Sequence, residues 1–335
     1  MSKRVGNQTV KISNPVFISN TYSIVGPKES EGPISKYFDN TIQDPFYGES
    51  TWEKAESKLT KSSISGCVAK SKISMQDIEY ILAGDLLNQC TSSCFAIRET
   101  QIPFVGLFGA CSTIVEAMAL GSMLIDGTFA NNILCTTSSH FCSAEKQFRF
   151  PLELGNQRPP SAQWTVTGSA CTMLTNSILG PKITHTTIGK IVDMGITDAN
   201  NMGAAMAPAA ANTIKTHLED TGRDPSYYDL IVTGDLGYIG KDIVCDILKA
   251  DNIDVKNNYN DCGVIMFDRE KQDTHAGGSG CACIGTTFAG YLYNQLQSKK
   301  LNKILLVGTG ALMNSTTCQQ KESIPGIAHA IAIEN

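Results

Sequence analysis

The sequence predicts an α/β protein in which two similar halves stack into five layers, αβαβα. Three observations predict this fold. Segments of the first half return in the same order in the second half, predicted strands alternate with predicted helices, and each half contains one helix that is apolar on nearly all sides. A chain of 335 residues, 42% hydrophobic and 18% charged, is long enough to bury such a core.

Four pairs of segments carry the internal repeat. In the longest pair, "DIEYILAGDLLNQ" (77–89) resembles "YYDLIVTGDLGYI" (227–239), and Gly-Asp-Leu recurs at an offset of 150 residues. The other pairs are two strands and a glycine-rich turn that enters a helix: 131–138 and 302–309, 167–175 and 325–333, 108–124 and 277–292. The order of the segments is the same in both halves, which indicates a duplicated unit.

Each half combines strands rich in β-branched residues with helices, a pattern that predicts parallel βαβ pairing. The helices that follow the two glycine-rich turns are apolar nearly all round, so we expect them between sheets and not on the surface. We expect a first half over residues 1–182, with a bridging, pocket-covering segment over about 140–182, and a second half over residues 183–335.

The composition excludes several classes of function. A formal net charge of −5 and the lack of a Lys/Arg run disfavour binding to nucleic acid or to an anionic membrane surface. The polar N-terminal segment lacks the apolar core of a secretory signal, and no apolar run reaches the roughly 18 residues of a membrane span. We expect a soluble intracellular protein.

The 12 cysteines are expected to be reduced, because no export signal accompanies them. Cys90 and Cys94 lack the spacing and the partner pair of a structural zinc site, and so do Cys281 and Cys283. We therefore expect no metal site and no bound cofactor.

Cys111 is the first candidate site residue. It lies in the turn "GACS", directly before an apolar helix, where unpaired backbone N–H groups and the helix dipole stabilise a thiolate. The alternative is a small buried hydrophobic residue, as free cysteines often are. The matching turn of the second half, "THAGGSGCACIG", offers His275 and Gly278 to the same pocket, although a single histidine is more often structural.

The bridging segment adds cationic and aromatic side chains. Arginine binds a carboxylate through two parallel hydrogen bonds, and an aromatic face suits a flat ring. The segment therefore predicts a pocket for a small aromatic acid, with a solvated loop as the alternative. The side chains concerned are His140, Lys146, Phe148, Arg149, Phe150, Arg158 and Trp164.

The duplicated unit with two buried central helices resembles the thiolase superfamily. That resemblance implies that Cys111 is at the position of the nucleophile and that His275 lies in the turn that carries a thiolase histidine. Near the end of the strand in "LIVTGDLGYIG", where ketoacyl synthases have a histidine and thiolases an asparagine, this chain has Gly234 and Asp235. A carboxylate there raises the pKa of a nearby thiol and opposes an enolate, so carbon–carbon bond formation is not expected.

Longer motifs are similar to the stage V sporulation protein AD family of spore-forming bacteria, essentially from end to end: "GPKESEGPISKYFD", "GACST", "SSHFCSAEKQFRFP", "NQRPPSAQWTVTGSACTML", "GDLGYIG", "HAGGSGCACIG" and "SIPGIAHAIAIE". The resemblance implies a thiolase-like fold that binds dipicolinic acid (pyridine-2,6-dicarboxylate), with or without calcium, for its uptake into the developing spore. It also implies membrane proteins of the same operon as partners and a peripheral position on the cytoplasmic side of the spore inner membrane, and it permits a homodimer.

The binding residues expected on these grounds are Cys111, His140, Arg149, Arg158, Trp164, Asp235, His275 and Gly278. The N-terminus of the helix after Cys111 would face one carboxylate of the ligand. Two other functions stay open. One is an acyltransferase with Cys111 as nucleophile and His275 as its partner, and the other is a scaffold that docks on membrane proteins.

Overall fold

The computed structural model describes residues 3–148 and 157–335. The helices and strands up to the middle of the chain are β1 (Thr9–Lys11), β2 (Phe17–Val25), α1 (Pro27–Ser30), β3 (Asn40–Thr41), α2 (Trp52–Lys70), β4 (Tyr80–Gly84), α3 (Thr91–Ile97), β5 (Phe104–Gly106), α4 (Thr113–Asp126), β6 (Asn132–Ser139), α5 (Phe141–Phe148), β7 (Trp164–Thr165) and β8 (Gly168–Thr175). Those that follow are β9 (Lys182–Thr187), α6 (Met202–Thr221), β10 (Leu230–Thr233), α7 (Gly237–Ala250), β11 (Tyr259–Asp261), α8 (Cys262–Met266), β12 (Gly278–Ser279), α9 (Cys281–Thr286), a π-helix (Thr287–Leu292), α10 (Tyr293–Gln297), β13 (Lys303–Ala311), α11 (Ser315–Gln319) and β14 (Gly326–Glu334).

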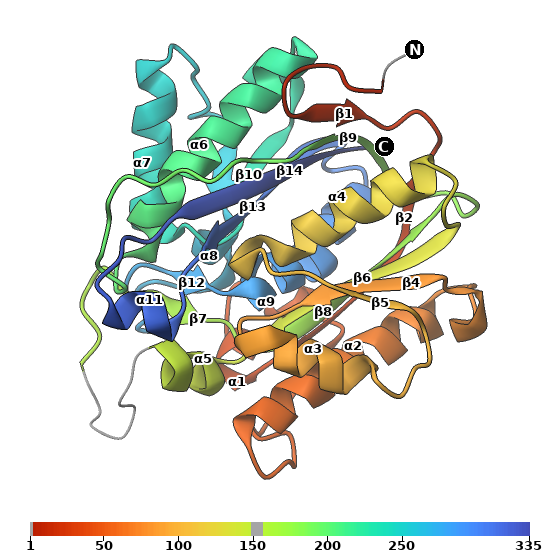
Figure 1. Ribbon diagram of the computed structural model, residues 1–335, viewed down its shortest axis with the longest axis horizontal. Helices are drawn as coiled ribbons and strands as arrows, with labels where there is room; N and C mark the ends of the chain where they lie inside the picture. The colour runs from red at the N-terminus through yellow and green to blue at the C-terminus, as the bar shows by residue number, and fades with distance from the viewer. Residues whose placement is uncertain (1–2, 149–156) are drawn as a thin grey trace.

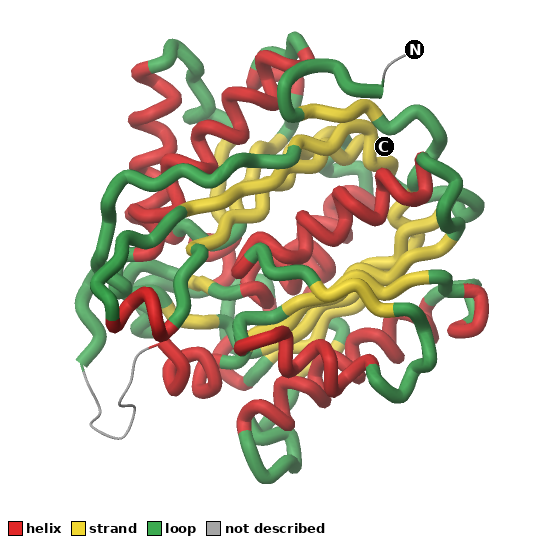
Figure 2. Tube along the Cα trace, viewed as in Figure 1, coloured by secondary structure: helices red, strands yellow, loops and turns green. Residues whose placement is uncertain are grey.

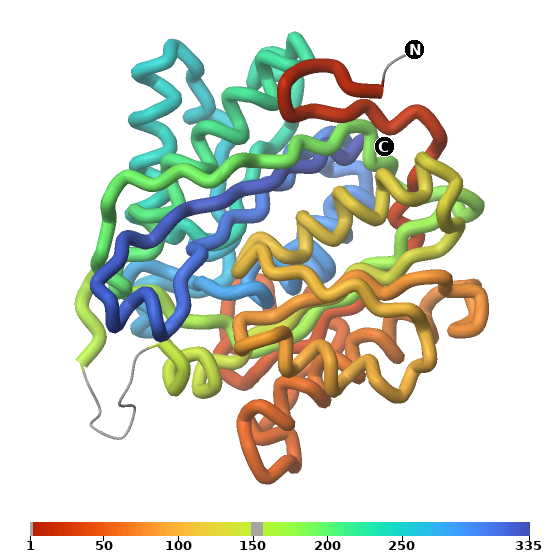
Figure 3. The backbone as a smooth tube through the Cα atoms, in the orientation of Figure 1, coloured from red at the N-terminus to blue at the C-terminus, as the bar shows by residue number. Residues whose placement is uncertain are grey.

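Two groups of strands have the same order and the same directions. In the N-terminal sheet, β5, β4 and β6 are parallel, and β8 and then β2 are each antiparallel to the preceding strand. In the C-terminal sheet, β11, β10 and β13 are parallel, and β14 and then β9 are each antiparallel to the preceding strand. Figure 3 shows β9, in green, beside β14, in dark blue. The duplicated unit predicted from the repeat is confirmed.

Helices lie between the two sheets and on both outer faces. Helix α4 contacts strands of both sheets, and α9 packs beside it. Helices α2 and α3 cover the outer face of the N-terminal sheet, and α6 and α7 cover that of the C-terminal sheet (Figures 1 and 2). The five layers predicted from the sequence are therefore present.

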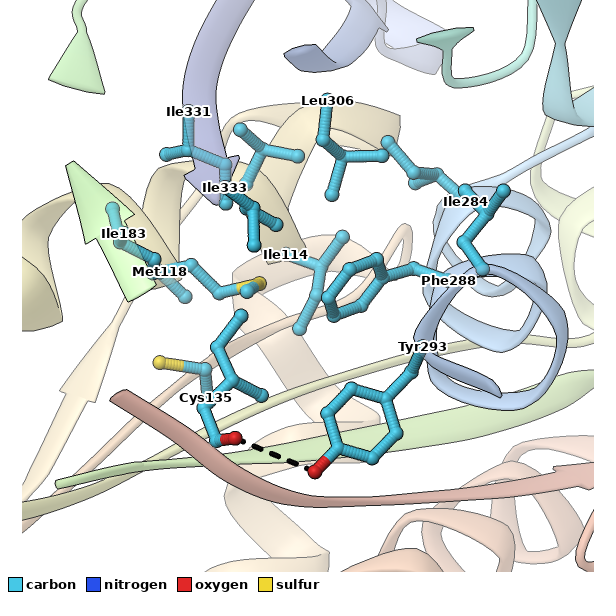
Figure 4. Packing of buried hydrophobic residues seen from close by; sticks show 14 of the residues in the cluster. Ile114, Met118, Cys135, Ile183, Ile284, Phe288, Tyr293, Leu306, Ile331 and Ile333 are labelled. Carbon is cyan, nitrogen blue, oxygen red and sulfur yellow. Dashed lines mark hydrogen bonds between the residues drawn. The ribbon is translucent and has the colours of Figure 1, made fainter. Parts of the chain in front are cut away.

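The central helices are buried because their side chains are almost all small or apolar. Ile114 and Met118 of α4 pack with Ile331 of β14 and with Phe288, which lies in the π-helix that continues α9 (Figure 4). Burial of one such side chain stabilises the folded state by about 1.5–3 kcal/mol. This packing fixes where α4 and α9 begin, and hence where the turns that precede them lie.

Part of the bridging segment belongs to the N-terminal sheet, as the match between 167–175 and 325–333 indicates. Strand β8 falls inside the predicted range 140–182, yet it is an internal strand of the N-terminal sheet, between β6 and β2. The connection therefore consists mainly of α5 and β7, and β7 pairs in parallel with β12 to link the two halves of the chain. Within the described residues, no helix has both the length and the apolar character needed to cross a membrane.

Candidate functional site

Cys111 lies in a tight turn that connects β5 with α4. Ala110 adopts a left-handed backbone conformation (φ 49°), and a short 3-10 turn precedes the helix. Two hydroxyl groups hold this turn: Ser112 Oγ donates to the carbonyl of Gly109 (2.6 Å), and Thr113 Oγ1 donates to the carbonyl of Ala110 (2.7 Å). The thiol is thus held, buried, at the N-terminal end of a central helix.

The Asp235 carboxylate follows β10 and contacts the thiol of Cys111. Its Oδ1 accepts a hydrogen bond from Thr309 Oγ1 (2.6 Å), and its Oδ2 accepts from Ser279 Oγ (3.1 Å) and from the backbone N–H of Gly280 (3.0 Å). Complete burial raises the pKa of Asp235, and these hydrogen bonds oppose the rise.

The surroundings of Cys111 keep its thiol protonated. The neighbouring Cys281 thiol, burial and the Asp235 carboxylate together hold the pKa of Cys111 well above the ordinary range of a cysteine. The dipole of α4 acts in the opposite direction, but its contribution at a helix terminus is at most about 2 kcal/mol. The Asp235 carboxylate, the Cys281 thiol and burial outweigh the helix dipole, so Cys111 is a hydrogen-bond donor and not a thiolate.

Cys281 is a site residue that the sequence did not single out. It is the first residue of α9, and its thiol donates to the carbonyl of Ala110 at 3.1 Å. The repeat contained the signal, because the turns "GACS" and "GSGC" precede the two central helices at matching places. The starts of the two helices meet at this pair of cysteines.

A small cavity adjoins Cys111 between the two halves of the chain. Its volume is about 30 Å³, enough for about one water molecule. Among the residues that the structure describes, 3–148 and 157–335, no lysine, arginine or histidine side chain lines it. The lining residues are Leu86, Phe108, Ala110, Cys111, Ala144, Glu145, Phe148, Thr165, Met202, Ser279, Ala311 and Met313.

The structure does not bring His275 into this cavity. Its Nδ1 is 2.9 Å from the carbonyl of Pro159, and its Nε2 is 3.0 Å from the carboxylate of Asp273. The backbone of His275 has a positive φ of 52°. The proton-transfer partner expected for Cys111 is therefore not at the thiol.

His140 also has hydrogen-bond partners away from Cys111. Its Nε2 donates to the carbonyl of Pro45 (2.8 Å), and its Nδ1 accepts from the backbone N–H of Cys142 (3.1 Å). Burial lowers its pKa, which favours the neutral ring that these two hydrogen bonds require. His140 fixes the start of α5 and does not reach the cavity at Cys111.

The short β7–β12 pair divides the predicted site residues into two groups. Thr165 and Ser279 line the cavity at Cys111, whereas their strand neighbours Trp164 and Gly278 do not. Successive residues of a strand point to opposite faces, so Trp164 and Gly278 face away from that cavity. Among the described residues, Cys111 and Asp235 therefore lie on one face of this pair and Trp164 lies on the other.

Trp164 lies close to an aromatic ring and to two cations. The ring of Phe141 stacks on it at a centroid distance of 3.7 Å and an interplanar angle of 9°. The guanidinium carbon of Arg158 and the ammonium of Lys28 are 4.8 Å and 4.3 Å from the indole centroid. Lys28 was not predicted, because nothing in its sequence context connects α1 with β7. Arg149 lies outside the described residues.

This architecture, with a cysteine before one of two central helices, is that of the thiolase-like proteins. The chain is similar to a variant of OleA from Xanthomonas campestris (TM-score 0.62, 11% identity, 97% of this chain and 99% of that chain). It is also similar to 3-oxoacyl-[acyl-carrier-protein] synthase III from Aquifex aeolicus VF5 (TM-score 0.54, 12% identity, 98% and 100%). The chain belongs to the stage V sporulation protein AD family, whose model matches residues 6–334. It is 44% identical, over 332 residues, to the Bacillus subtilis (strain 168) stage V sporulation protein AD, covering 99% of this chain and 98% of that protein.

Proposed function

We propose that this chain binds dipicolinic acid for uptake into the developing spore and does not catalyse acyl transfer. Membership of the sporulation family supports the biological setting. The environment of Cys111 supports the proposal that the chain does not catalyse acyl transfer. The thiol contacts a buried carboxylate, Asp235, and neither His140 nor His275 lies at the thiol.

Acyl transfer requires a nucleophile that is readily deprotonated and donors that stabilise a developing oxyanion or enolate. At Cys111 the neighbouring groups act in the opposite sense. Asp235 is an acceptor that disfavours a thiolate, and a negative charge that formed beside it would be repelled. The cavity of about 30 Å³ also leaves no room for an acyl chain without rearrangement.

The choice of dipicolinate as the ligand is supported by membership of the sporulation family and by the cationic side chains near Trp164. Dipicolinate is a flat ring with two carboxylates, and such a ligand requires cationic donors and an aromatic surface. The chain presents both at Trp164, where Arg158 and Lys28 lie against the indole. We propose that calcium, when present, enters as a complex with the ligand.

Uptake across a membrane requires further proteins. We propose that the chain acts with membrane proteins of the same sporulation operon, as a peripheral component on the cytoplasmic side of the spore inner membrane. A homodimer is part of this proposal, since closed two-fold pairs are the commonest form of soluble oligomers.

Calorimetric titration of the purified protein with dipicolinate tests the proposal. We expect saturable heat with dipicolinate and weaker binding of pyridine-2-carboxylate, which keeps the ring and lacks one carboxylate. Titrations with and without calcium separate the free acid from its chelate. The absence of binding heat from the folded protein under either condition would contradict the proposal.

The second candidate is acyl transfer, favoured by the position of Cys111 at the start of α4 beside a cavity in a thiolase-like fold. Intact-mass spectrometry after incubation with acyl-CoA separates the two functions. A mass increase that is lost in Cys111→Ala and turns over with time would establish the enzyme. We expect no such adduct.

A further inference from the structure

We propose that a surface groove beside Tyr37 and Tyr291 is the docking site for an acidic peptide segment of a partner protein. This tyrosine groove has a volume of about 640 Å³. It is separate from the cavity at Cys111, because the two have no described lining residue in common. The inference rests on the proposed association of the chain with other proteins, and not on the binding of dipicolinate.

The walls of the tyrosine groove come from parts of the chain that pack closely on one another. Tyr37 ends a short 3-10 turn, Ser35–Tyr37, and Tyr291 lies in the π-helix. Their rings meet edge to face, with centroids 5.1 Å apart. Gly290 permits this approach, since a Cβ there would lie 2.9 Å from the carbonyl oxygen of Tyr37. The shape of the groove is therefore fixed by the fold, at a π-helix, an element that often marks functional sites.

The groove combines an apolar floor with a charged rim. Leu230, Ile265 and Leu301 line it, and all three are half-buried and packed against the hydrophobic core. Lys36 and Lys300 also line it and are exposed. A peptide that places apolar side chains on the floor can therefore present acidic side chains to the rim.

The charge of the rim favours an acidic occupant. Within residues 3–148 and 157–335, neither Lys36 nor Lys300 forms an ion pair. Asp229 is the acidic side chain among the described lining residues, and its Oδ2 accepts from the backbone N–H groups of Asn302 (2.6 Å) and Lys303 (2.9 Å). The groove thus presents positive charge on a protein whose formal net charge is −5.

Gln295 adds a buried donor to the wall of the groove. This residue of α10 is only 7% exposed, and in the described part of the chain its Nε2 has no hydrogen-bond partner. A buried N–H group without an acceptor destabilises a protein, and a carbonyl or carboxylate oxygen of a bound peptide would supply that acceptor. The carbonyl of Gln295 accepts from the backbone N–H groups of Lys300 (3.0 Å) and Leu301 (3.2 Å), so Gln295 also holds the cationic rim in place.

The open form of the groove favours a peptide over a small anion. Pro33, Lys36, Asp229 and Lys300 are all exposed, so the groove is open to solvent along its rim. Sites for small molecules usually enclose most of the ligand surface. An extended segment needs only one side covered, with its apolar side chains on the floor and its backbone within reach of the donor.

Selection from a random dodecapeptide library displayed on phage, with the purified protein as bait, tests the inference. We expect the selected peptides to be rich in Asp and Glu together with Leu, Ile, Val or Phe. Synthetic copies should bind more weakly as salt increases. Lys36→Glu combined with Lys300→Glu should weaken their binding by at least about 10-fold, because like charges then face one another.

Gln295→Met keeps the approximate size of the side chain and removes the donor. It should weaken peptide binding by about 2- to 10-fold, the usual loss for one hydrogen bond, without lowering the melting temperature. A purely structural glutamine would show the reverse pattern. The matched control combines Lys72→Glu with Lys190→Glu, which makes the same change of charge at two exposed lysines outside the groove. The control should bind the peptides as the parent protein does.

The outcomes separate this inference from the binding of dipicolinate. The inference is overturned if the selection yields no acidic peptide, or if the selected peptides bind equally to the Lys36→Glu/Lys300→Glu protein. Displacement of the peptides by micromolar inorganic phosphate would assign the groove to a small anion and would also overturn it. Calorimetry with dipicolinate is unaffected by these results, and a protein that binds the peptides without binding dipicolinate would refute only the proposed ligand.

Discussion

Replacement of Asp235 by asparagine should convert Cys111 from an inert thiol into a reactive one. The change removes the carboxylate of Asp235, which contacts the thiol, and keeps the size of the side chain. An asparagine oxygen can still accept from Thr309 or from the backbone N–H of Gly280, so the fold is expected to survive. The loss of part of this network should lower the free energy of unfolding by about 1–3 kcal/mol.

The size of the effect follows from the charge that is removed. A unit charge about 4 Å away, at an effective dielectric constant of about 20, interacts by about 4 kcal/mol, which corresponds to a factor of about 1,000 in the population of the thiolate. A thiolate of lower pKa is intrinsically less nucleophilic, with a Brønsted coefficient of about 0.4–0.5. The net gain in the alkylation rate of Cys111 at a fixed neutral pH is therefore about 30- to 60-fold.

Alkylation by iodoacetamide as a function of pH, with peptide mapping of Cys111, measures this gain. Mapping is needed because Cys94 is exposed and other cysteines are half-buried. The matched control is Asp261→Asn, a second buried aspartate that accepts from Thr233 Oγ1 (2.7 Å) and lies beside Cys262. It loosens a similar network without removing a charge from Cys111.

Two results would refute this reasoning. One is rapid alkylation of Cys111 at neutral pH in the unmodified protein, which would show that the thiol is already activated. The other is an equal gain in Asp235→Asn and Asp261→Asn, which would mean that local loosening, and not the carboxylate, controls the reactivity.

Three further predictions concern stability. Burial raises the pKa of Glu29 from 4.5 to about 7, so between these values only the unfolded chain ionises and the folded state loses stability as pH rises. Glu29→Gln removes this loss, and chemical denaturation should show a gain of about 3 kcal/mol at about pH 8 and none at about pH 4. Ile114 lies between the two sheets, so Ile114→Ala should lower the free energy of unfolding by about 2–5 kcal/mol. Leu179 is 83% exposed, so Leu179→Ala should lower it by less than about 0.5 kcal/mol. Similar losses for the two variants in thermal unfolding would contradict the assignment of the layers. In Gly310→Ala the new Cβ would lie 2.3 Å from the carbonyl oxygen of Gly109, in the turn that holds Cys111. This variant should therefore have a lower melting temperature and a changed rate of alkylation at Cys111. Unchanged values of both would show that β13 is not in close contact with this turn.

The fold could be predicted because its determinants are periodic and repeated along the chain. The apolar surface around "STIVEAMALGSML" requires a buried helix, and the recurrence of Gly-Asp-Leu places β4 and β10 at matching positions. The same repeat could have identified Cys281, since its turn matches that of Cys111. The repeat also indicated the place of β8, since the segment 167–175 matches 325–333, and β8 and β14 occupy equivalent positions in their sheets.

The arrangement of the site could be predicted only in part. The position of Cys111 beside Asp235 follows from the repeat and from the resemblance to thiolases. The separation of Trp164 from Cys111 depends on which way a two-residue strand faces, and the sequence contains no period long enough to show this. The contact between Lys28 and Trp164 joins segments far apart in the chain, so only tertiary structure reveals it.

A crystal structure of the protein with bound dipicolinate tests the central claim most directly. The account predicts an ordered dipicolinate whose two carboxylates meet cationic side chains, and an unmodified Cys111. A folded protein that holds no ordered ligand in crystals grown at saturating dipicolinate would contradict it.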